Sequence, residues 1–350
     1  MEEQTSAVQI DPSKIMQIGM GFWASKVLLA AVKFKLFTLL AGTSKSGKEV
    51  KEILQLGTTT RHVYDWLDTL VSLGFLKREG LLDDAKYSNA PDTEMFLDSN
   101  KPSYMGGILQ MGNNRLYHHW ANLEEGLLTG KPQNESKDEN NMHFFEDLYK
   151  SPEKLHEFID AMSGIQGGNF MALAKKFNFS NYKTLSDIGG ADGFLSALIA
   201  KHHPQIKCTT FDLPPVAPLA EAKLKQFNVA DRVSVASGDF EKDPLPSAEI
   251  ITMGNILHGL NEEAKQKLMK KVYDALPENG AFMAIENVID NDRSKNTFGL
   301  LMSLNMLIEN GDGYDYTHDD FDKLAKDAGF KRTELIPLAG PTSAVVAYKN

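Results

Sequence analysis

A glycine-rich loop reads Asp187-Ile188-Gly189-Gly190-Ala191-Asp192-Gly193 and joins an apolar segment, residues 184–188, to a stretch of helical character. Glycine lets the backbone turn tightly and approach a ligand, and the free amides at the start of a helix favour an anionic group. The loop therefore predicts a ligand-binding turn between the first strand of a sheet and the helix that follows it.

Strands and helices alternate along the rest of the chain, which is typical of a parallel, doubly wound sheet. The C-terminal end differs, because two apolar segments flank Gly340-Pro341 and predict a hairpin that adds an antiparallel strand at the sheet edge. We therefore expect an α/β fold, a Rossmann-like doubly wound sheet with a C-terminal antiparallel hairpin. The expected strands are residues 184–188, 208–211, 233–236, 250–253, 281–285, 331–336 and 344–348.

Acidic residues follow three successive strands of this sheet. Asp187 stands beside the glycine loop, where it would repel a pyrophosphate but suits the ammonium group of an amino acid. Asp212 ends the second strand and is placed to bind ribose hydroxyls. Asp239 and Phe240 follow the third strand and offer a carboxylate and a ring to an adenine. The glycine spacing also resembles the nicotinamide-dinucleotide fingerprint, but together these acids favour a nucleoside joined to an amino acid.

The N-terminal part predicts a winged helix. A long helix over residues 16–40, a helix–turn–helix over 50–56 and 63–73, and a small β-wing over 75–88 make up the pattern. Such a module serves DNA recognition or dimerisation. Residues 1–101 hold 12 basic and 13 acidic side chains, and Asp65 and Asp68 lie on the helix that would face DNA, so carboxylates would repel phosphate. We expect a dimerisation domain over 1–101, a catalytic domain over 102–350 with a helical acceptor-pocket segment over 102–178, and a homodimer.

Composition excludes several other classes. The 350 residues carry a formal net charge of −10, which disfavours nucleic acid as a partner. A single cysteine, Cys208, excludes a disulfide framework and a cysteine-built metal site, and we expect no metal. The chain starts with Glu2 and Glu3 rather than a basic-then-apolar leader, and its most apolar stretch, near 27–32, is interrupted by Lys33. These features predict a cytoplasmic enzyme with no membrane partner.

These motifs together resemble the class I S-adenosyl-L-methionine-dependent methyltransferases. More narrowly, the chain is similar to the small-molecule O-methyltransferases of the plant caffeate/acetylserotonin type and their bacterial relatives. The segments that carry the resemblance are 187–193, 211–214, 238–240, 255–258 and Glu286. The resemblance implies S-adenosyl-L-methionine (SAM) as the cofactor. The residues expected to contact it are Asp187, Gly189, Gly190, Asp212, Leu213, Asp239, Phe240 and Asn255.

Two residues at the carboxyl edge of the sheet are candidates for proton transfer. His258 follows the fourth strand, and a histidine with an ordinary pKa near 6.5 can take a phenol proton at neutral pH. Glu286 ends the fifth strand and could hold the imidazole in its useful tautomer. The resemblance implies a second catalytic carboxylate before the last helix of the catalytic domain. When the family pattern is aligned on Phe321, this carboxylate falls at Asp315. The chain departs from the family pattern at His258-Gly259-Leu260, where relatives usually have His-Asp-Trp.

An aromatic and methionine-rich set is expected to line the acceptor pocket. Asn305 is the most telling member, since a polar amide inside an apolar helix must find a partner, and a substrate hydroxyl is one candidate. A wet, aromatic-lined cleft fits a small phenolic or quinonoid acceptor. The expected acceptor-binding residues are Trp120, Phe144, Phe145, Met162, Gln166, Met302, Asn305 and Met306.

Other functions are also compatible with these sequence features. A C-methyltransferase or a methyl-inactive relative would use the same fold and cofactor. An NAD-dependent dehydrogenase would use the glycine loop alone, and a ligand-sensing transcription factor would use the winged helix on DNA. O-methyl transfer to a small aromatic hydroxyl, with His258 as general base, is the function that the sequence favours.

Overall fold

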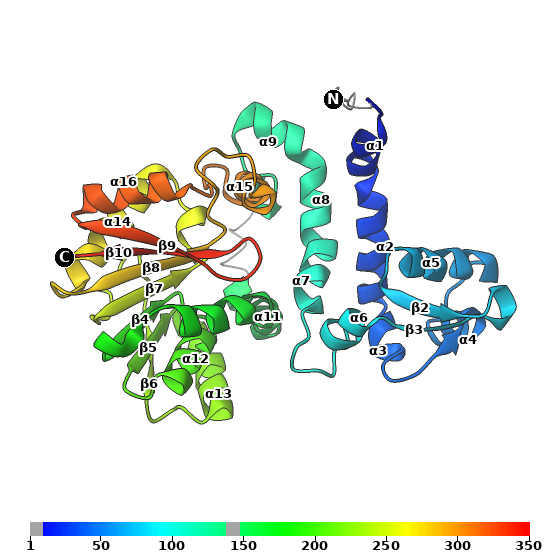
Figure 1. The fold of residues 1–350 in the computed structure, drawn as a ribbon, viewed down its shortest axis with the longest axis horizontal. Helices are drawn as coiled ribbons and strands as arrows, with labels where there is room; N and C mark the ends of the chain where they lie inside the picture. Colours follow the sequence, from blue (N-terminus) through cyan, green and yellow to red (C-terminus); the bar gives the residue numbers. More distant parts are fainter. Residues whose placement is uncertain (1–9, 138–147) are drawn as a thin grey trace, which may run out of the picture. The chain divides into compact units, whose positions relative to one another are not determined.

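The computed structural model describes residues 10–137 and 148–350, and the chain divides into two compact units, Met1–Leu116 and Tyr117–Asn350 (Figure 1). The division falls later than the expected boundary at residue 101, because helix α7 (Gly106–Met111) packs against helix α2 (Gly21–Lys33) of the first unit.

The first unit contains the predicted winged helix. Helices α4 and α5 form the helix–turn–helix, and strands β2 and β3 form the wing, to which a short strand, β1, is added in the order β1-β3-β2. Its elements are α1 (Ser13–Gly19), α2, α3 (Leu36–Leu39), β1 (Lys45–Ser46), α4 (Gly47–Ile53), α5 (Thr60–Ser72), β2 (Leu76–Glu79), β3 (Lys86–Asn89), α6 (Pro91–Phe96) and α7.

The prediction of one long helix over 16–40 is wrong, because the backbone breaks it into α1, α2 and α3. Met20 ends α1 and precedes α2, and Lys35 adopts a left-handed conformation with φ of 54° between α2 and α3. A left-handed residue cannot continue a right-handed helix. The apolar side chains over this region therefore belong to three short helices.

Asp68 ties the wing to helix α5. Its carboxylate lies 2.7 Å from the Arg78 guanidinium and accepts a hydrogen bond of 2.8 Å from the Tyr87 hydroxyl. The carboxylate that argued against DNA recognition thus has a structural role in the described protein. The prediction that nucleic acid is not a partner stays a prediction.

One apolar segment of this unit has the length of a membrane span. Ser13–Lys33 has a mean hydropathy of 1.5 and is 11% buried, and by length and composition alone it would suffice to cross a bilayer. The same surface is what a dimer interface of the first unit would cover. The predictions of a cytoplasmic protein and of no membrane partner stay predictions.

The second unit is built on a seven-stranded sheet in the order β6-β5-β4-β7-β8-β10-β9. Strands β4 to β8 run parallel, which confirms the doubly wound arrangement, and β10 pairs antiparallel with both β8 and β9. The strands are β4 (Thr184–Ile188), β5 (Lys207–Asp212), β6 (Val233–Ser237), β7 (Ile250–Gly254), β8 (Ala281–Glu286), β9 (Arg332–Pro337) and β10 (Ser343–Tyr348).

The C-terminal hairpin is confirmed, and its strand β9 is the antiparallel edge strand that the sequence predicts. Strand β10 lies inside the sheet, and β9 forms the edge. The physical reason is burial, since five of the six residues of β10 are buried and none of β9 is. An apolar strand gains most from neighbours on both sides.

Helices cover both faces of the sheet (Figure 1). Helices α11 (Pro152–Lys176), α12 (Phe194–His202) and α13 (Ala217–Phe227) contribute to the apolar core on one face. Helices α14 (Glu262–Ala275) and α16 (His318–Ala328) contribute to the core on the other. The remaining helices, α8 (Tyr117–His119), α9 (Leu123–Thr129) and α15 (Thr297–Asn310), lie near the carboxyl edge, where β4, β5, β7 and β8 end in the candidate site residues.

Candidate active site

The loop over residues 189–193 requires glycine at three positions for steric reasons. Gly189 and Gly193 adopt left-handed backbone with φ of 66° and 75°. A Cβ on Gly190 would lie 2.3 Å from Thr210 Oγ1 and 2.9 Å from Asp187 Oδ2. The Gly189 and Gly190 amides both donate to the Phe211 carbonyl, which fastens the loop to β5. No side chain larger than hydrogen fits between the loop and the strand.

Asp187 is a buried carboxylate at the end of β4. It accepts a hydrogen bond of 2.8 Å from the Thr252 hydroxyl on the neighbouring strand β7. Burial raises the pKa of Asp187 to about 7, with the carboxylates of Asp212 and Asp192 adding to the rise. A cation placed beside Asp187 would reverse that effect, so the position fits the ammonium group of an amino-acid ligand.

Asp212 bridges the loop and the end of β5. Its two oxygens accept hydrogen bonds from the amides of Ala191 (2.9 Å) and Leu213 (2.7 Å). Burial raises the pKa of the Asp212 carboxyl above its ordinary value. Each carboxylate oxygen retains a second lone pair, so the group can also accept from two hydroxyls of a ribose.

Asp239 and Phe240 follow β6, as expected. The Asp239 carboxylate accepts from the Glu241 amide and lies 2.7 Å from the exposed ammonium of Lys242, which lowers the pKa of Asp239. Phe240 is half-buried against the core beneath α14. Asn255 adopts left-handed backbone (φ 54°) and turns the chain from β7 towards His258. These residues lie at the same sheet edge as the glycine loop, and their cofactor roles remain proposals.

The residues present fit SAM as the cofactor. The loop requires glycine, because a Cβ on Gly189 or Gly190 would collide with neighbouring side chains, and the carboxylates of Asp187 and Asp212 stand at the ends of adjacent strands. Leu213, whose amide binds Asp212, continues this surface. An ammonium group and ribose hydroxyls are the partners that such carboxylates can take.

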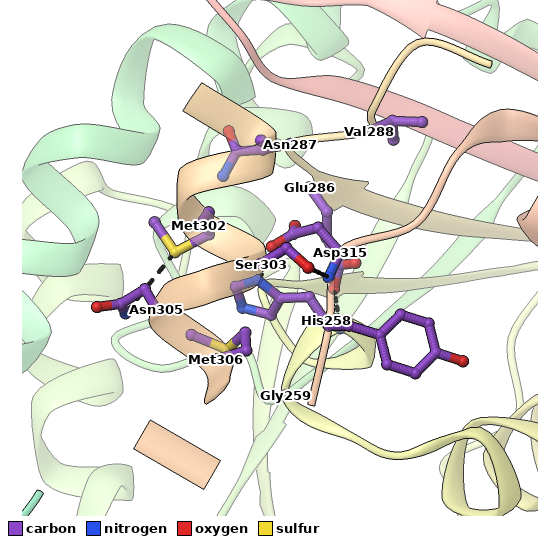
Figure 2. Close-up of polar contacts among 12 residues, drawn as sticks. His258, Gly259, Glu286, Asn287, Val288, Met302, Ser303, Asn305, Met306 and Asp315 are labelled. Carbon is purple, nitrogen blue, oxygen red and sulfur yellow. Dashed lines mark hydrogen bonds and ion pairs between the residues drawn. The ribbon is translucent and has the colours of Figure 1, made fainter. Parts of the chain in front are cut away.

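His258 is buried on a short 3-10 turn, Leu257–Gly259, directly after β7. Its Nδ1 lies 3.4 Å from Asp315 Oδ1, on the segment between α15 and α16 (Figure 2). Asp315 is itself buried, and the Ser303 hydroxyl on α15 accepts from its amide at 3.2 Å. Asp315 is therefore the carboxylate that faces Nδ1 of the imidazole.

Glu286 has a different place from the one expected. We expected it to orient the His258 ring, but its Oε1 accepts from the backbone amides of Ile256 (2.9 Å) and His258 (3.3 Å) instead. Glu286 is the last residue of β8, and its carboxylate binds the main chain of the turn that carries the histidine. Glu286 shapes the turn, and Asp315 faces the ring.

The carboxylates around His258 outweigh its burial. Burial lowers the pKa of the imidazole, whereas Asp315, Glu286 and the Asn255 backbone raise it, and the net pKa lies above that of an ordinary histidine. Burial also raises the pKa of Glu286, against the opposing effect of His258. A proton arriving at Nε2 is thus stabilised by two buried acids.

Helix α15 brings three of the expected acceptor residues to His258. Met302, Asn305 and Met306 line the helix face that lies over the imidazole (Figure 2). Asn305 Oδ1 accepts a hydrogen bond of 2.8 Å from the Trp120 indole, so its partner is another expected pocket residue. Within the described residues the Asn305 amide donates only to Met302 Sδ, at 3.9 Å, which leaves donor capacity for a ligand.

Two further expected acceptor residues lie on another helix, and their role stays a prediction. Met162 and Gln166 are on α11, where Gln166 accepts a hydrogen bond of 2.9 Å from Asn169. In residues 10–137 and 148–350 no hydrogen bond joins either of them to His258 or α15. Phe144 and Phe145 lie outside the described residues.

Sequence reasoning missed three residues, two of which contact the glycine loop. The Ser163 hydroxyl on α11 donates to Asp192 of the glycine loop at 2.9 Å, and Lys223 on α13 pairs with the same carboxylate at 3.0 Å. No local pattern links these positions. The third is Lys265, buried on α14 among apolar positions spaced three and four residues apart, and that spacing was a signal the sequence offered.

Profiles of two protein domains match this chain. The O-methyltransferase domain matches residues 120–331, and the O-methyltransferase dimerisation domain matches residues 16–99. The tetracenomycin polyketide synthesis 8-O-methyl transferase TcmO of Streptomyces glaucescens is 36% identical over 338 residues, 97% of each chain. The N,N-dimethyltransferase OxyT of Streptomyces rimosus is 28% identical over 91% of this chain and 90% of its own.

The fold also has a close likeness among solved structures. Human N-acetylserotonin methyltransferase in complex with SAM superposes with a TM-score of 0.88. The match covers 99% of this chain and 100% of that one at 24% identity, so it shows a shared fold.

Proposed function

This chain belongs to the O-methyltransferase family, and on that premise we propose that it transfers the methyl group of SAM to a hydroxyl oxygen of a small aromatic acceptor, with His258 as general base. The observation that supports the base assignment is the buried pair of His258 Nδ1 and Asp315 Oδ1, 3.4 Å apart at the sheet edge that holds the glycine loop.

Each candidate site residue would have a separate role in binding or in proton transfer. SAM, when bound, supplies an electrophilic methyl group on a sulfonium. Asp187 would hold an ammonium, Asp212 the ribose hydroxyls, and Asp239 with Phe240 the adenine. His258 Nε2 would take the hydroxyl proton of the acceptor, and Asp315 would stabilise the imidazolium. Met302, Met306 and Trp120 would hold a planar ring in a near-attack position, and the Asn305 amide would donate to a polar group on it.

A phenolic or quinonoid acceptor suits the surface formed by Met302, Met306 and Trp120 better than an aliphatic acceptor does. Thioether and indole groups pack well on flat rings. TcmO, whose name states an 8-O-methyl transfer in tetracenomycin polyketide synthesis, supports the choice of a polycyclic phenol.

The test is methyl transfer from ¹³C-methyl-labelled SAM to a panel of phenols, anthraquinones and flavonoids. We expect products heavier by one labelled methyl group, with a ¹³C shift in the methoxy range. A label on nitrogen would favour the chemistry in the name of OxyT, and a label on carbon would favour C-methylation. No labelled product, with SAM bound, would favour a methyl-inactive relative.

We also propose that the protein is a homodimer through its first unit. Several large apolar side chains of α1 and α2 are exposed, including Ile18, Phe22 and Trp23, and the dimerisation-domain match covers this region. Clustered apolar exposure of this kind marks an interface.

Light scattering at micromolar concentration is therefore expected to give twice the chain mass of 38.8 kDa. The double variant Phe22→Glu/Trp23→Glu should shift the protein towards monomer, because it places charges in the proposed interface. Leu81→Glu, on an exposed residue of the wing loop, is the matched control and should stay dimeric. A wild-type monomer would refute the proposal.

A further inference from the structure

Lys265 is a fully buried lysine on α14, the helix that follows the His258 turn. Its Nζ donates a hydrogen bond of 2.9 Å to the Tyr314 carbonyl and lies 3.0 Å from the centroid of the Tyr314 ring. A buried ammonium is costly unless opposite charge and hydrogen bonds compensate for the lost water. The burial of this ammonium group therefore has to be compensated by nearby charges and hydrogen bonds.

The compensating charges include the two acids of the candidate site. Lys265 interacts electrostatically with Glu286 and Asp315, both buried, and with Glu262 and Asp312. The Tyr316 ring is 5.9 Å from Nζ. A cavity of about 340 Å³ is lined in part by Arg293, Asp320 and Lys323 as well as Glu262, Tyr314 and Asp315. Burial lowers the pKa of Lys265 to about 8, so it is a cation at neutral pH.

The hydrogen bond acts on the main chain next to Asp315. Lys265 fixes the carbonyl of Tyr314, and the following residue presents its carboxylate to His258 Nδ1. Helix α14 thus anchors the segment that sets the distance between the acid and the imidazole.

The charge acts on the resting state of the base. With His258 neutral, Glu286 and Asp315 would leave two uncompensated negative charges in a buried site, and such a site draws a proton onto the imidazole. An imidazolium cannot accept a proton from a substrate. The Lys265 ammonium acts against that attraction, because the same two carboxylates stabilise its charge and raise its pKa.

We propose that Lys265 is a positioning residue for methyl transfer, which holds Asp315 in register with His258 and weakens the hold of the two acids on a proton at the imidazole. The inference rests on the proposed function for its catalytic meaning. The coupling between Lys265 and His258 itself is independent of any reaction.

The test is an NMR titration of the His258 imidazole in the protein without substrate, in five variants and the wild type. Lys265→Met and Lys265→Gln both remove the charge, and Gln can still donate to the Tyr314 carbonyl. Both should raise the pKa of His258. Lys265→Arg keeps a cation and should leave it nearly unchanged. Lys267→Met is the matched control, because Lys267 is 74% exposed and pairs only with Glu263 among the described residues. Asp315→Asn should lower the pKa and shows that the signal reports charge at this site.

Single-turnover rates with saturating SAM give the second readout. In Lys265→Gln the acidic limb of the pH–rate profile should move to higher pH, because the base must be neutral to act. In Lys265→Met the plateau should also fall, since the anchor is lost. An unchanged His258 titration in folded Lys265→Gln would overturn the proposal, and so would a raised pKa in Lys265→Arg. A shifted titration in a protein that transfers no methyl group would instead refute the proposed function and leave the coupling intact.

Discussion

Replacing His258 with alanine is expected to lower the single-turnover rate of methyl transfer by roughly 10²–10⁴, the usual contribution of a positioned acid–base group. His258 is buried, and its Nδ1 faces Asp315 at 3.4 Å. The variant loses both the proton acceptor and the acid that stabilises the product imidazolium.

Affinity for SAM should stay within about threefold in the same variant, because the imidazole faces the acceptor side and the nucleoside side is formed by Asp212 and Asp239. Calorimetry measures that affinity directly. His62→Ala is the matched control, since His62 is exposed on α5 of the first unit. A His258→Ala rate within a factor of about ten of wild type would exclude a general base at this position.

Asp212→Ala is expected to weaken SAM binding at least about tenfold. Hydrogen bonds to a charged group contribute roughly 1.5–3 kcal/mol each, and about 1.4 kcal/mol corresponds to a factor of ten in affinity. The loss has a second source in this chain, because Asp212 also accepts from the Ala191 and Leu213 amides and so holds the glycine loop.

The fold should survive this substitution, since Asp212 ends its strand and is half-buried rather than in the core. Asp231→Ala removes an exposed carboxylate of the same sheet region and should leave SAM affinity unchanged. If a well-folded Asp212→Ala variant binds SAM as the wild type does, the cofactor lies elsewhere.

The sheet was predictable because its determinants are local. Apolar runs separated by helical stretches marked every strand of the second unit, and the glycine loop marked the first turn. The break of the N-terminal helix was not predictable, because Lys35 adopts a left-handed backbone that its residue type does not favour. The place of β10 inside the sheet depends on burial against β8, which no local pattern specifies.

The proximity of the three candidate proton-transfer residues was predictable from the sequence, but their contacts were not. His258, Glu286 and Asp315 lie close together, but which of the two acids faces the imidazole ring depends on how the end of β8 is placed relative to the turn after β7. Asn305 needed a partner, as expected, and found it in Trp120, 185 residues away in the chain. Such contacts are set by tertiary structure and leave no periodic signal.

The measurement that tests the central claim most directly is the single-turnover rate of wild type and His258→Ala with phenols of graded acidity. More acidic phenols are already ionised and need no base, so the deficit of the variant should shrink as the acceptor pKa falls. It should also shrink as the pH rises towards the acceptor pKa. A uniform loss, independent of acceptor pKa, would contradict the account and show that the site works by proximity alone.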